Sequence, residues 1–327
     1  MGTTSRTIPA LNKRVQHITV GHFYANHAEQ LGMHLEGSSR GLNRLIREPT
    51  INRPGLALCG FFTYFAGKRM QVLGAAELSY LKSLKATVLR ERLHDFFSHN
   101  MPCVVVARNT PIPEALLAAA AAFDTPVFRT SMITMKFINA ATISMEFDFA
   151  PSTSEHGSMV DILGIGTLIR GASGIGKSEC VLGLIERGHS IVSDDVTRFR
   201  SIEGRELLGM SDELSRYHME VRGIGIINIA SMFGAGAVRP EKRLNFVVTL
   251  KDWQDVEDVD RIGLDRATYD ILGIKIPHVT LPVRMGRDLA RLVEVAALDQ
   301  KLKDMGQNSA VEFNQKLLHM ISERRSR

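Results

Sequence analysis

This chain of 327 residues has few cysteines, no long apolar segment and no dense block of charge. Its three cysteines, Cys59, Cys103 and Cys180, are too scattered to form a disulfide framework or a zinc-binding pattern. The longest apolar run extends from Ala115 to Phe123, which is far too short to cross a bilayer. The N-terminus has no signal-peptide core, and Arg6 does not fit a myristoylation motif. We therefore expect a cytoplasmic protein with no membrane partner.

The chain also lacks a strong excess of charge of one sign. Its formal net charge is +5, and the basic residues are dispersed apart from the tail at 324–327. It has no Arg/Gly-rich segment, no aromatic RNA-recognition motif and no zinc finger. A mildly basic surface permits an anionic ligand, but we expect no nucleic-acid partner.

Length and hydrophobic content predict a globular protein of two domains. With 327 residues, of which 44% are hydrophobic, either half can bury its own core. The stretch 139–145 is predicted to join the domains as a helix or a strand, and a polar break at 150–155 ends this link. We place an N-terminal α/β domain at 1–138 and a catalytic domain at 139–327.

The first domain alternates between helix and strand patterns. Helices are expected over 28–45, 76–97 and 113–122, and strands over 56–62 and 103–107. This alternation predicts a small α/β domain with a parallel sheet. Its histidines match no compact ligand set, so we expect no metal site there; they are His17, His22, His27 and His34. Its role, regulatory or in assembly, is open.

The second domain begins with a predicted hairpin over 156–169. Further strands are expected at 191–192, 246–250 and 276–281, and helices at 288–303 and 311–322. Mixed strands and helices again indicate an α/β class.

The most informative segment is a glycine-rich run that matches G-x-x-x-x-G-K-[ST] at every fixed position. It consists of Gly171, Ala172, Ser173, Gly174, Ile175, Gly176, Lys177 and Ser178. An apolar strand pattern at 165–170 precedes it, and a helical pattern at 178–187 follows it. In this context backbone N–H groups and the helix N-terminus bind phosphate oxygens. Lys177 supplies a cation, and the Ser178 hydroxyl is suited to Mg²⁺.

Two adjacent carboxylates, Asp194 and Asp195, follow the next predicted strand. A carboxylate at the end of that strand is where a P-loop protein places its metal ligand or base. Asp195 comes only eighteen residues after Lys177, and this compact spacing disfavours motors and transporters. One of the two is expected to cap a turn.

Together with three further strings, these features resemble the bacterial HPr kinase/phosphorylase family. His156 and Gly157, the phosphate loop and the aspartate pair occur in the family's order and spacing over residues 139–322. The most specific string consists of Met219, Glu220, Val221, Arg222, Gly223, Ile224, Gly225, Ile226, Ile227 and Asn228. The others are 233–239 and the run Pro282, Val283, Arg284, Met285, Gly286 and Arg287. Ala172 stands where the family commonly has Asp. We expect this difference to adjust the activity rather than to abolish it.

The resemblance implies a bifunctional enzyme. It would phosphorylate a serine of HPr, the small phosphocarrier of the sugar phosphotransferase system, with ATP or pyrophosphate as donor. It would also remove that phosphate by phosphorolysis, in which inorganic phosphate attacks and pyrophosphate leaves. A homohexamer, a kinase domain similar to phosphoenolpyruvate carboxykinase and a role in carbon metabolism are implied as well.

The same resemblance assigns roles to the candidate residues. Asp195 would be general base and acid, hydrogen-bonded by His156, and Lys177 would bind phosphate. Ser178 and Glu220 would hold Mg²⁺, and Arg261 would neutralise charge on the transferring phosphoryl group. The segment 219–228 would take part in both phosphorylation and dephosphorylation of HPr, and the segment 282–287 would take part in dephosphorylation. The alternatives are surface charges and a structural histidine.

Two other functions are compatible with the residues alone. One is a small-molecule kinase or nucleotide-dependent carboxykinase, which would need a dedicated substrate pocket. The other is a nucleotide-gated regulator with little turnover, which would need fewer acid, base and arginine candidates than this chain offers.

Overall fold

The computed structural model describes residues 15–256, 267–284 and 286–325. The described residues up to Ala150 form one compact unit, here the N-terminal unit, and those from Pro151 form the C-terminal unit. The domain boundary expected between residues 138 and 139 lies inside helix α6 (Thr134–Phe149). This helix contacts α1, β4 and β5. The residues from 139 to 150 therefore belong to the N-terminal unit.

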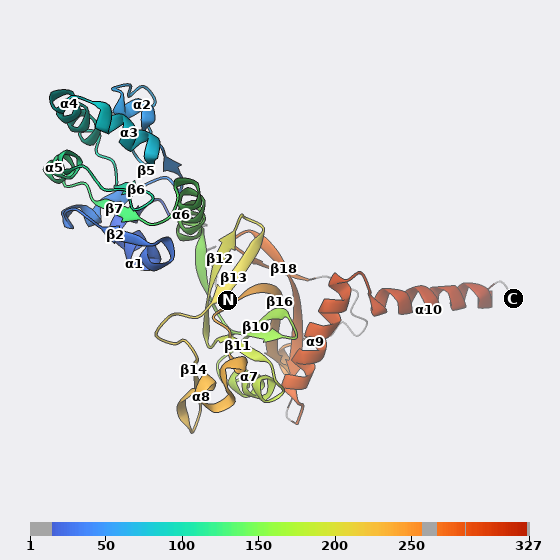
Figure 1. The fold of residues 1–327 in the computed structure, drawn as a ribbon. Coiled ribbons are helices and arrows are strands. Elements are labelled where there is room, and N and C mark those ends of the chain that lie inside the picture. Colours follow the sequence, from blue (N-terminus) through green and yellow to red (C-terminus); the bar gives the residue numbers. More distant parts are fainter. Residues whose placement is uncertain (1–14, 257–266, 285, 326–327) are drawn as a thin grey trace, which may run out of the picture. The chain divides into compact units, whose positions relative to one another are not determined.

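The N-terminal unit is built on a five-stranded sheet with the strand order β2-β7-β6-β5-β4 (Figure 1). Strands β4 to β7 run parallel to their neighbours, whereas β2 pairs with β7 in the antiparallel sense. The bounds are β2 Met33–Leu35, β4 Ile51–Asn52, β5 Met70–Leu73, β6 Val104–Val106 and β7 Val127–Thr130. A short ribbon pairs β1 (Ile18–Thr19) with β3 (Leu45–Ile46). The expected parallel sheet is thus confirmed, with one antiparallel edge strand.

Helices cover both faces of this sheet. Alternate residues of β6 belong to different cores, because side chains on a strand point to opposite faces. Val105 packs with α1 (Val20–Leu31) and α6, whereas Val104 and Val106 pack with the other helices. Those helices are α2 Gly55–Leu58, α3 Ala75–Ser83, α4 Ala86–Phe97 and α5 Glu114–Ala122.

The helix expected over 76–97 is two helices, α3 and α4, separated by Leu84 and Lys85 in extended conformation. Two other elements expected in this unit are wrong. The helix predicted over 28–45 instead starts at Val20, where the Thr19 hydroxyl accepts the His22 N–H at 3.0 Å. It ends at Gly32, whose φ of 55° closes the last turn in the left-handed region. The segment after Gly32 forms β2, a 3₁₀ turn η1 (Arg40–Asn43) and β3. The strand predicted over 56–62 is the short helix α2 followed by turns.

The C-terminal unit contains a nine-stranded sheet whose main path is β11-β9-β10-β16-β13-β12-β8. Strand β10 is parallel to β16, and β16 is parallel to β18; the other pairs are antiparallel. The bounds are β8 Ser152–His156, β9 Ser158–Ile162, β10 Ile165–Gly171, β11 Ser190–Ser193, β12 Val196–Ile202, β13 Glu206–Met210, β16 Glu241–Asp252, β17 Thr268–Ile271 and β18 Ile274–Val283. The predicted hairpin that leads into the phosphate loop is formed by β9 and β10.

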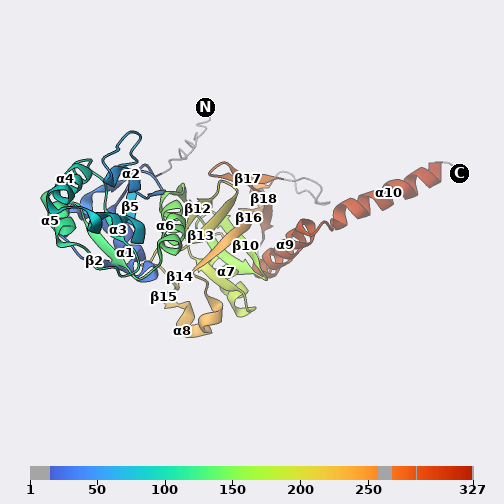
Figure 2. The ribbon, with the colours of Figure 1, turned by 45° about the horizontal axis from the view of Figure 1, so that its top comes forward.

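Two helices, α7 (Lys177–Glu186) and α9 (Leu289–Asp304), pack against this sheet and against each other (Figure 2). Their buried apolar residues share one core with β9, β10 and β16. The remaining elements are β14 His218–Val221, β15 Gly225–Asn228, α8 Ile229–Phe233, η2 Ala235–Ala237, η3 Trp253–Asp255 and α10 Ser309–Arg325. In the described parts of both units, no helix is long and apolar enough to span a membrane.

Candidate active site

The phosphate loop lies between β10 and α7, as the sequence predicts. Strand β10 ends at Gly171, and α7 begins at Lys177. Gly174 and Gly176 have φ values of 84° and 97°, a region that side chains with a Cβ rarely adopt. These two glycines turn the chain sharply, so that the loop wraps in front of the N-terminus of α7. The N–H groups at the start of α7 and the partial positive charge of its N-terminus therefore favour binding of an anion in the loop.

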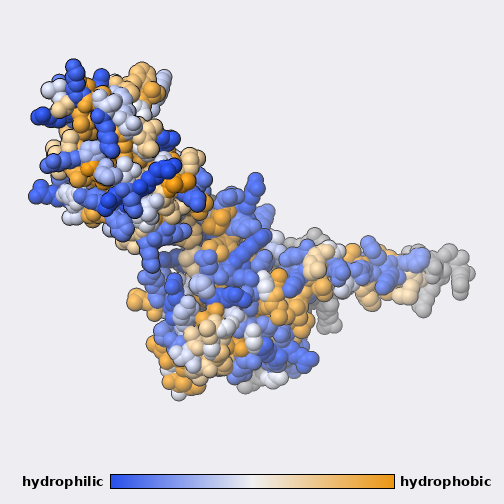
Figure 3. Space-filling model, viewed as in Figure 1, coloured by the Kyte–Doolittle hydropathy of each residue, from blue (hydrophilic) through white to orange (hydrophobic). Residues whose placement is uncertain are grey.

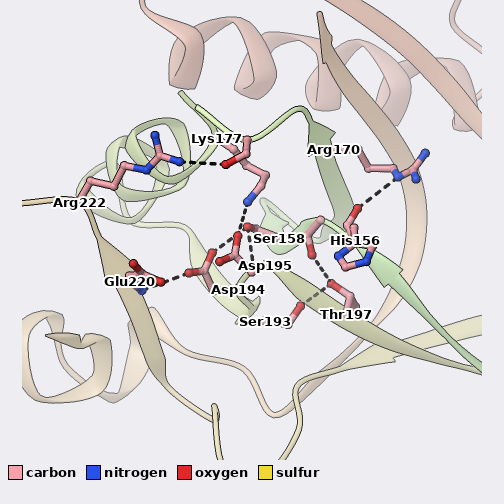
Figure 4. Close-up of polar contacts among 12 residues, drawn as sticks. His156, Ser158, Arg170, Lys177, Ser193, Asp194, Asp195, Thr197, Glu220 and Arg222 are labelled. Carbon is pink, nitrogen blue, oxygen red and sulfur yellow. Dashed lines mark hydrogen bonds and ion pairs between the residues drawn. The ribbon is translucent and has the colours of Figure 1, made fainter. Parts of the chain in front are cut away.

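A cavity of about 180 Å³ brings the loop together with residues from distant segments. It is lined by the loop residues Ala172, Ser173, Gly174, Gly176, Lys177 and Ser178 and by Glu179, Asp195, Glu220 and Arg222. Asp195 follows β11, and the last two belong to the ribbon of β14 and β15. The structure thus places the predicted phosphate loop, the predicted base and the predicted metal ligands around one space. Figure 4 shows the side chains of Lys177, Asp195 and Glu220 in this region.

Asp195 is the accessible member of the aspartate pair. Its side chain is 58% exposed and forms an ion pair with Nζ of Lys177, whose side chain is 14% exposed. Its backbone has a φ of 54°, held by two hydrogen bonds: Gly157 N–H to the Asp195 carbonyl at 2.8 Å, and Asp195 N–H to Ser158 Oγ at 3.3 Å. A residue held in this sparsely populated conformation needs surrounding contacts that fix it.

Asp194 is buried more deeply than Asp195, and both of its carboxylate oxygens accept hydrogen bonds. Its Oδ1 accepts the Ser158 hydroxyl at 2.8 Å, and its Oδ2 accepts the Glu220 N–H at 3.3 Å. Burial raises the pKa of the Asp194 carboxyl; the hydrogen bond from Ser158 opposes this, and the charge of Asp195 adds to it. Asp194 therefore ties β9 and β14 to the turn that carries Asp195, and it has less access to a substrate than Asp195.

The ribbon of β14 and β15 delivers two charged side chains to the cavity. Met219 is buried in the core, so the next residue, Glu220, faces the other way along the strand. Beyond the strand, Arg222 Nη2 donates to Ser173 Oγ at 2.9 Å and links the ribbon to the phosphate loop. This contact was not predicted, because pairing a turn with a loop 49 residues away depends on tertiary structure.

His156 does not form the hydrogen bond that was expected. In the structure no hydrogen bond joins the described His156 ring to the Asp195 carboxylate, and the two residues are connected through the backbone. Strands β8 and β12 pair His156 with Val196, the residue after Asp195. The His156 side chain is exposed and lines a second cavity, of about 640 Å³.

This second cavity shares the loop residues Ala172, Ser173 and Gly174 with the first. Its other wall contains Arg170, which stacks on Tyr269 at 4.3 Å, and Lys251 and Asp252 at the end of β16. Arg170, Lys251 and Asp252 were not predicted as site residues from the sequence. The signal was present, because the carboxyl ends of parallel strands lie at one edge of a sheet, and 246–250 was correctly predicted as a strand.

Two other predicted groups are described only in part or not at all. Arg261 lies outside the described residues, as does Met285 in the run 282–287. Arg284 and Arg287 are placed next to the ring of Trp253, with guanidinium carbons 5.9 and 5.7 Å from its centroid. The run precedes α9, whose Leu289 lies close to Gly176; a Cβ added to Gly176 would be 3.3 Å from Leu289 Cδ1.

Comparison with known proteins identifies relatives of both units. A family model described as HPr Serine kinase N terminus matches residues 18–145, and one described as HPr Serine kinase C-terminal domain matches residues 147–317. The HPr kinase/phosphorylase of Bacillus cereus (strain B4264) is 40% identical over 293 residues, which cover 90% of this chain and 95% of the relative. The HPr kinase/phosphorylase of Bacillus anthracis (strain A0248) gives the same values.

Among solved structures, the Hpr(Ser) kinase/phosphatase from Coxiella burnetii is 32% identical with a TM-score of 0.45, and the match covers 49% of this chain and 98% of that one.

The fold and the site define a kinase domain with a P-loop, preceded by a separate α/β domain. This chain belongs to the HPr kinase/phosphorylase family, and it is an enzyme of the kinase/phosphorylase type. The resemblance seen in the sequence is confirmed. The comparisons do not support a small-molecule kinase or a carboxykinase.

Proposed function

We propose that this chain transfers the terminal phosphoryl group of ATP or pyrophosphate to a serine of HPr, and that it removes the phosphate again by phosphorolysis. One observation carries the proposal above all. A single cavity joins a phosphate loop, an accessible carboxylate and a second carboxylate on a separate ribbon. Phosphoryl transfer needs a phosphate cradle, a proton acceptor and charge neutralisation in one place.

In the forward direction, Asp195 accepts the proton of the serine hydroxyl as that oxygen attacks the terminal phosphorus. Its exposure, together with its position beside Lys177, supports this role. Lys177 and the N–H groups at the start of α7 bind the phosphate oxygens on which negative charge accumulates. In reverse, protonated Asp195 returns the proton to the serine oxygen as it leaves, and inorganic phosphate in the loop is the nucleophile.

The oxygen donors around the cavity fit Mg²⁺. Ser178 offers a hydroxyl and Glu220 a carboxylate. No cluster of three or more His, Cys, Asp or Glu ligands occurs among the described residues. Mg²⁺ in phosphoryl-transfer sites is held by one or two carboxylates together with waters and substrate phosphates, so two protein ligands are sufficient. When bound, Mg²⁺ would neutralise charge on the phosphates.

A protein substrate is supported by the apolar surface next to the ribbon. Large apolar side chains are exposed there: Ile224 is 75% exposed, Ile226 76% and Met232 62%. Orange residues gather around α8 in Figure 3, at the end of the C-terminal unit. Exposed apolar groups of this kind mark contact surfaces for other proteins. Since they follow Glu220 directly, a docked protein could present its serine to Asp195.

We further propose a homohexamer in the cytoplasm, as the family resemblance implies. Exposed apolar residues on α10 support an assembly, since such a helix face is expected to be covered; they are Phe313, Leu317, Leu318, Met320 and Ile321. Light scattering coupled to size-exclusion chromatography measures the assembly mass and would detect a monomer or dimer instead.

The function is tested by incubating the full chain with ATP, Mg²⁺ and purified HPr. Mass spectrometry should find one phosphoryl group on a serine of HPr. Adding inorganic phosphate to phosphoserine-HPr should release pyrophosphate and restore unmodified HPr. An HPr in which this serine is replaced by Ala is the control. ATP turnover without modified HPr would contradict the proposal.

A further inference from the structure

The N-terminal unit contains a cavity of its own, remote in sequence from every residue of the active site. Its volume is about 360 Å³, which falls in the range of small-molecule sites. Three segments surround it: the end of β3, the loop from Phe62 to Lys68, and the turn from His99 to Pro102 after α4. We name it the basic cavity, after Arg47 and Lys68, which line it.

Two cationic side chains, Arg47 and Lys68, line the basic cavity. Arg47 and Lys68 lie on neighbouring segments, joined by a hydrogen bond from the Arg47 N–H to the Lys68 carbonyl at 3.3 Å. Neither forms an ion pair with any residue that the structure describes, and no carboxylate lines the cavity. The nearby Glu48 is already paired with Arg69. Two like charges that share a cavity attract an anion.

Asn100 adds a further donor. Its Oδ1 accepts a hydrogen bond from Arg44 Nη2 at 3.3 Å, and Arg44 also donates to the Met101 carbonyl at 2.8 Å. A guanidinium has only donors, so it must face the amide oxygen. The Nδ2 group of Asn100 therefore keeps both of its N–H groups for another partner.

One wall of the basic cavity is aromatic. The His99 ring stacks on Phe62 with centroids 4.0 Å apart and planes 14° from parallel, and it meets Phe65 edge-on at 5.6 Å. Its Nδ1 lies 2.8 Å from the Asp95 carbonyl, which fixes the ring and makes Nδ1 the donor. A rigid stack of this kind offers a flat apolar surface beside the cationic groups.

We propose that the basic cavity binds a small anion that carries a phosphate or carboxylate group and a planar or apolar part. Arg47, Lys68 and Asn100 would contact the anionic group, and Phe62 and His99 the planar part. The proposal does not depend on the proposed kinase activity, because all of these residues belong to the N-terminal unit.

The test uses phenyl phosphate as probe, since it combines a phosphate with one aromatic ring. Calorimetric titration compares the full chain with a variant carrying Arg47→Ala and Lys68→Ala. We expect the double variant to bind phenyl phosphate at least about tenfold more weakly, because each hydrogen bond to a charged group contributes appreciably to the free energy of binding. A matched control carries Lys82→Ala and Arg90→Ala, two exposed cations on α3 and α4, and should bind as the parent does.

A Lys177→Ala variant distinguishes binding in the basic cavity from binding in the phosphate loop. Binding that survives in this variant but is lost with Arg47 and Lys68 supports the proposal. Binding that is lost only with Lys177 belongs to the phosphate loop and overturns it. Equal loss in both double variants, or no binding of phenyl phosphate to the parent at millimolar concentration, also overturns it.

Two further probes test the two halves of the proposed ligand. Inorganic phosphate lacks the ring, and benzoate replaces the phosphate by a carboxylate. Weaker binding of inorganic phosphate than of phenyl phosphate supports the aromatic wall, and equal binding overturns that part. Melting temperature, measured on the same preparations, shows that each variant is folded. HPr phosphorylation by the parent and the two double variants separates failure of this proposal from failure of the proposed function.

Discussion

Lys177 and Asp195 form an ion pair that joins the first residue of α7 to the turn after β11. The lysine is the cation of the phosphate loop, and the aspartate is the proposed base. A phosphate oxygen that binds Lys177 therefore competes with Asp195 for the same ammonium group. We infer that donor binding releases the Asp195 carboxylate toward the serine hydroxyl, which couples phosphate binding to activation of the acceptor.

Replacing Lys177 with Ala should reduce phosphorylation of HPr by roughly 10²-fold or more, because a charge that stabilises the transition state is lost. The melting temperature should change little, since Asp195 is exposed and needs no buried partner. Initial rates and thermal melts on one preparation measure both. Lys275→Ala, an exposed lysine on β18, is the matched control and should keep normal activity. Normal ATP turnover by the Lys177 variant would show that the loop is not the donor site.

Replacing Asp195 with Asn should slow phosphorylation and phosphorolysis alike, by roughly 10²–10⁴-fold, because proton transfer is removed from both directions. The substitution should not strain the backbone, since Asn tolerates the left-handed conformation at φ 54°. Both rates are measured with HPr and phosphoserine-HPr. If the Asp194→Asn variant were inactive while the Asp195→Asn variant kept nearly normal rates, the proposed base would be the wrong one of the pair.

Much of this site could be predicted from local sequence. The phosphate loop, its strand and its helix follow from glycine positions and apolar spacing, and the structure places them within one residue of the expected bounds. The contact of Arg222 with Ser173 could not be predicted, because it depends on how a distant ribbon folds over the loop. The helix expected over 28–45 was wrong for a local reason. Gly32 ends α1, and the polar residues after it only imitate helical spacing.

Asp194 should make stability depend on pH. Burial raises its pKa in the folded state above the unfolded value, so the folded protein binds this proton more tightly. The contribution to stability is therefore complete below the unfolded pKa and is lost as pH rises through the raised pKa. Asp194→Asn removes this titration. The melting temperature of the variant, relative to the parent, should rise between pH 4 and pH 7, as measured by calorimetry. A constant difference across this range would contradict the burial of a titrating Asp194.

Replacing Glu220 with Gln should raise the Mg²⁺ concentration needed for half-maximal phosphorylation by roughly tenfold or more, because an anionic oxygen ligand is lost. The measurement is a Mg²⁺ titration at saturating ATP and HPr. Glu179→Gln is the matched control, since Glu179 lines the same cavity but lies on α7. An unchanged titration for the Glu220 variant, or an equal shift in both variants, would assign Glu220 a structural role.

The two directions of the reaction should be separable at Arg287. The run 282–287 begins at the end of β18 and precedes α9, whose Leu289 lies close to Gly176 of the phosphate loop, and guanidinium groups are suited to bind phosphate. Arg287→Ala should therefore weaken phosphorolysis of phosphoserine-HPr, by roughly tenfold, more than it weakens phosphorylation by ATP. Phosphorolysis requires an additional phosphate, either as nucleophile or on the serine, whereas a neutral hydroxyl needs no such contact.

The competing explanation is that Arg287 braces the fold through the ring of Trp253, which it faces at 5.7 Å. In that case both activities should fall together, in step with the melting temperature. Arg284→Ala is the matched variant, because Arg284 faces the same ring at 5.9 Å from the other end of the loop. The rates of phosphorylation and phosphorolysis and the melting curve of each variant distinguish a phosphate contact from a structural role. A selective loss of phosphorolysis at unchanged melting temperature identifies a phosphate contact, since a packing defect does not distinguish between the two directions of one reaction.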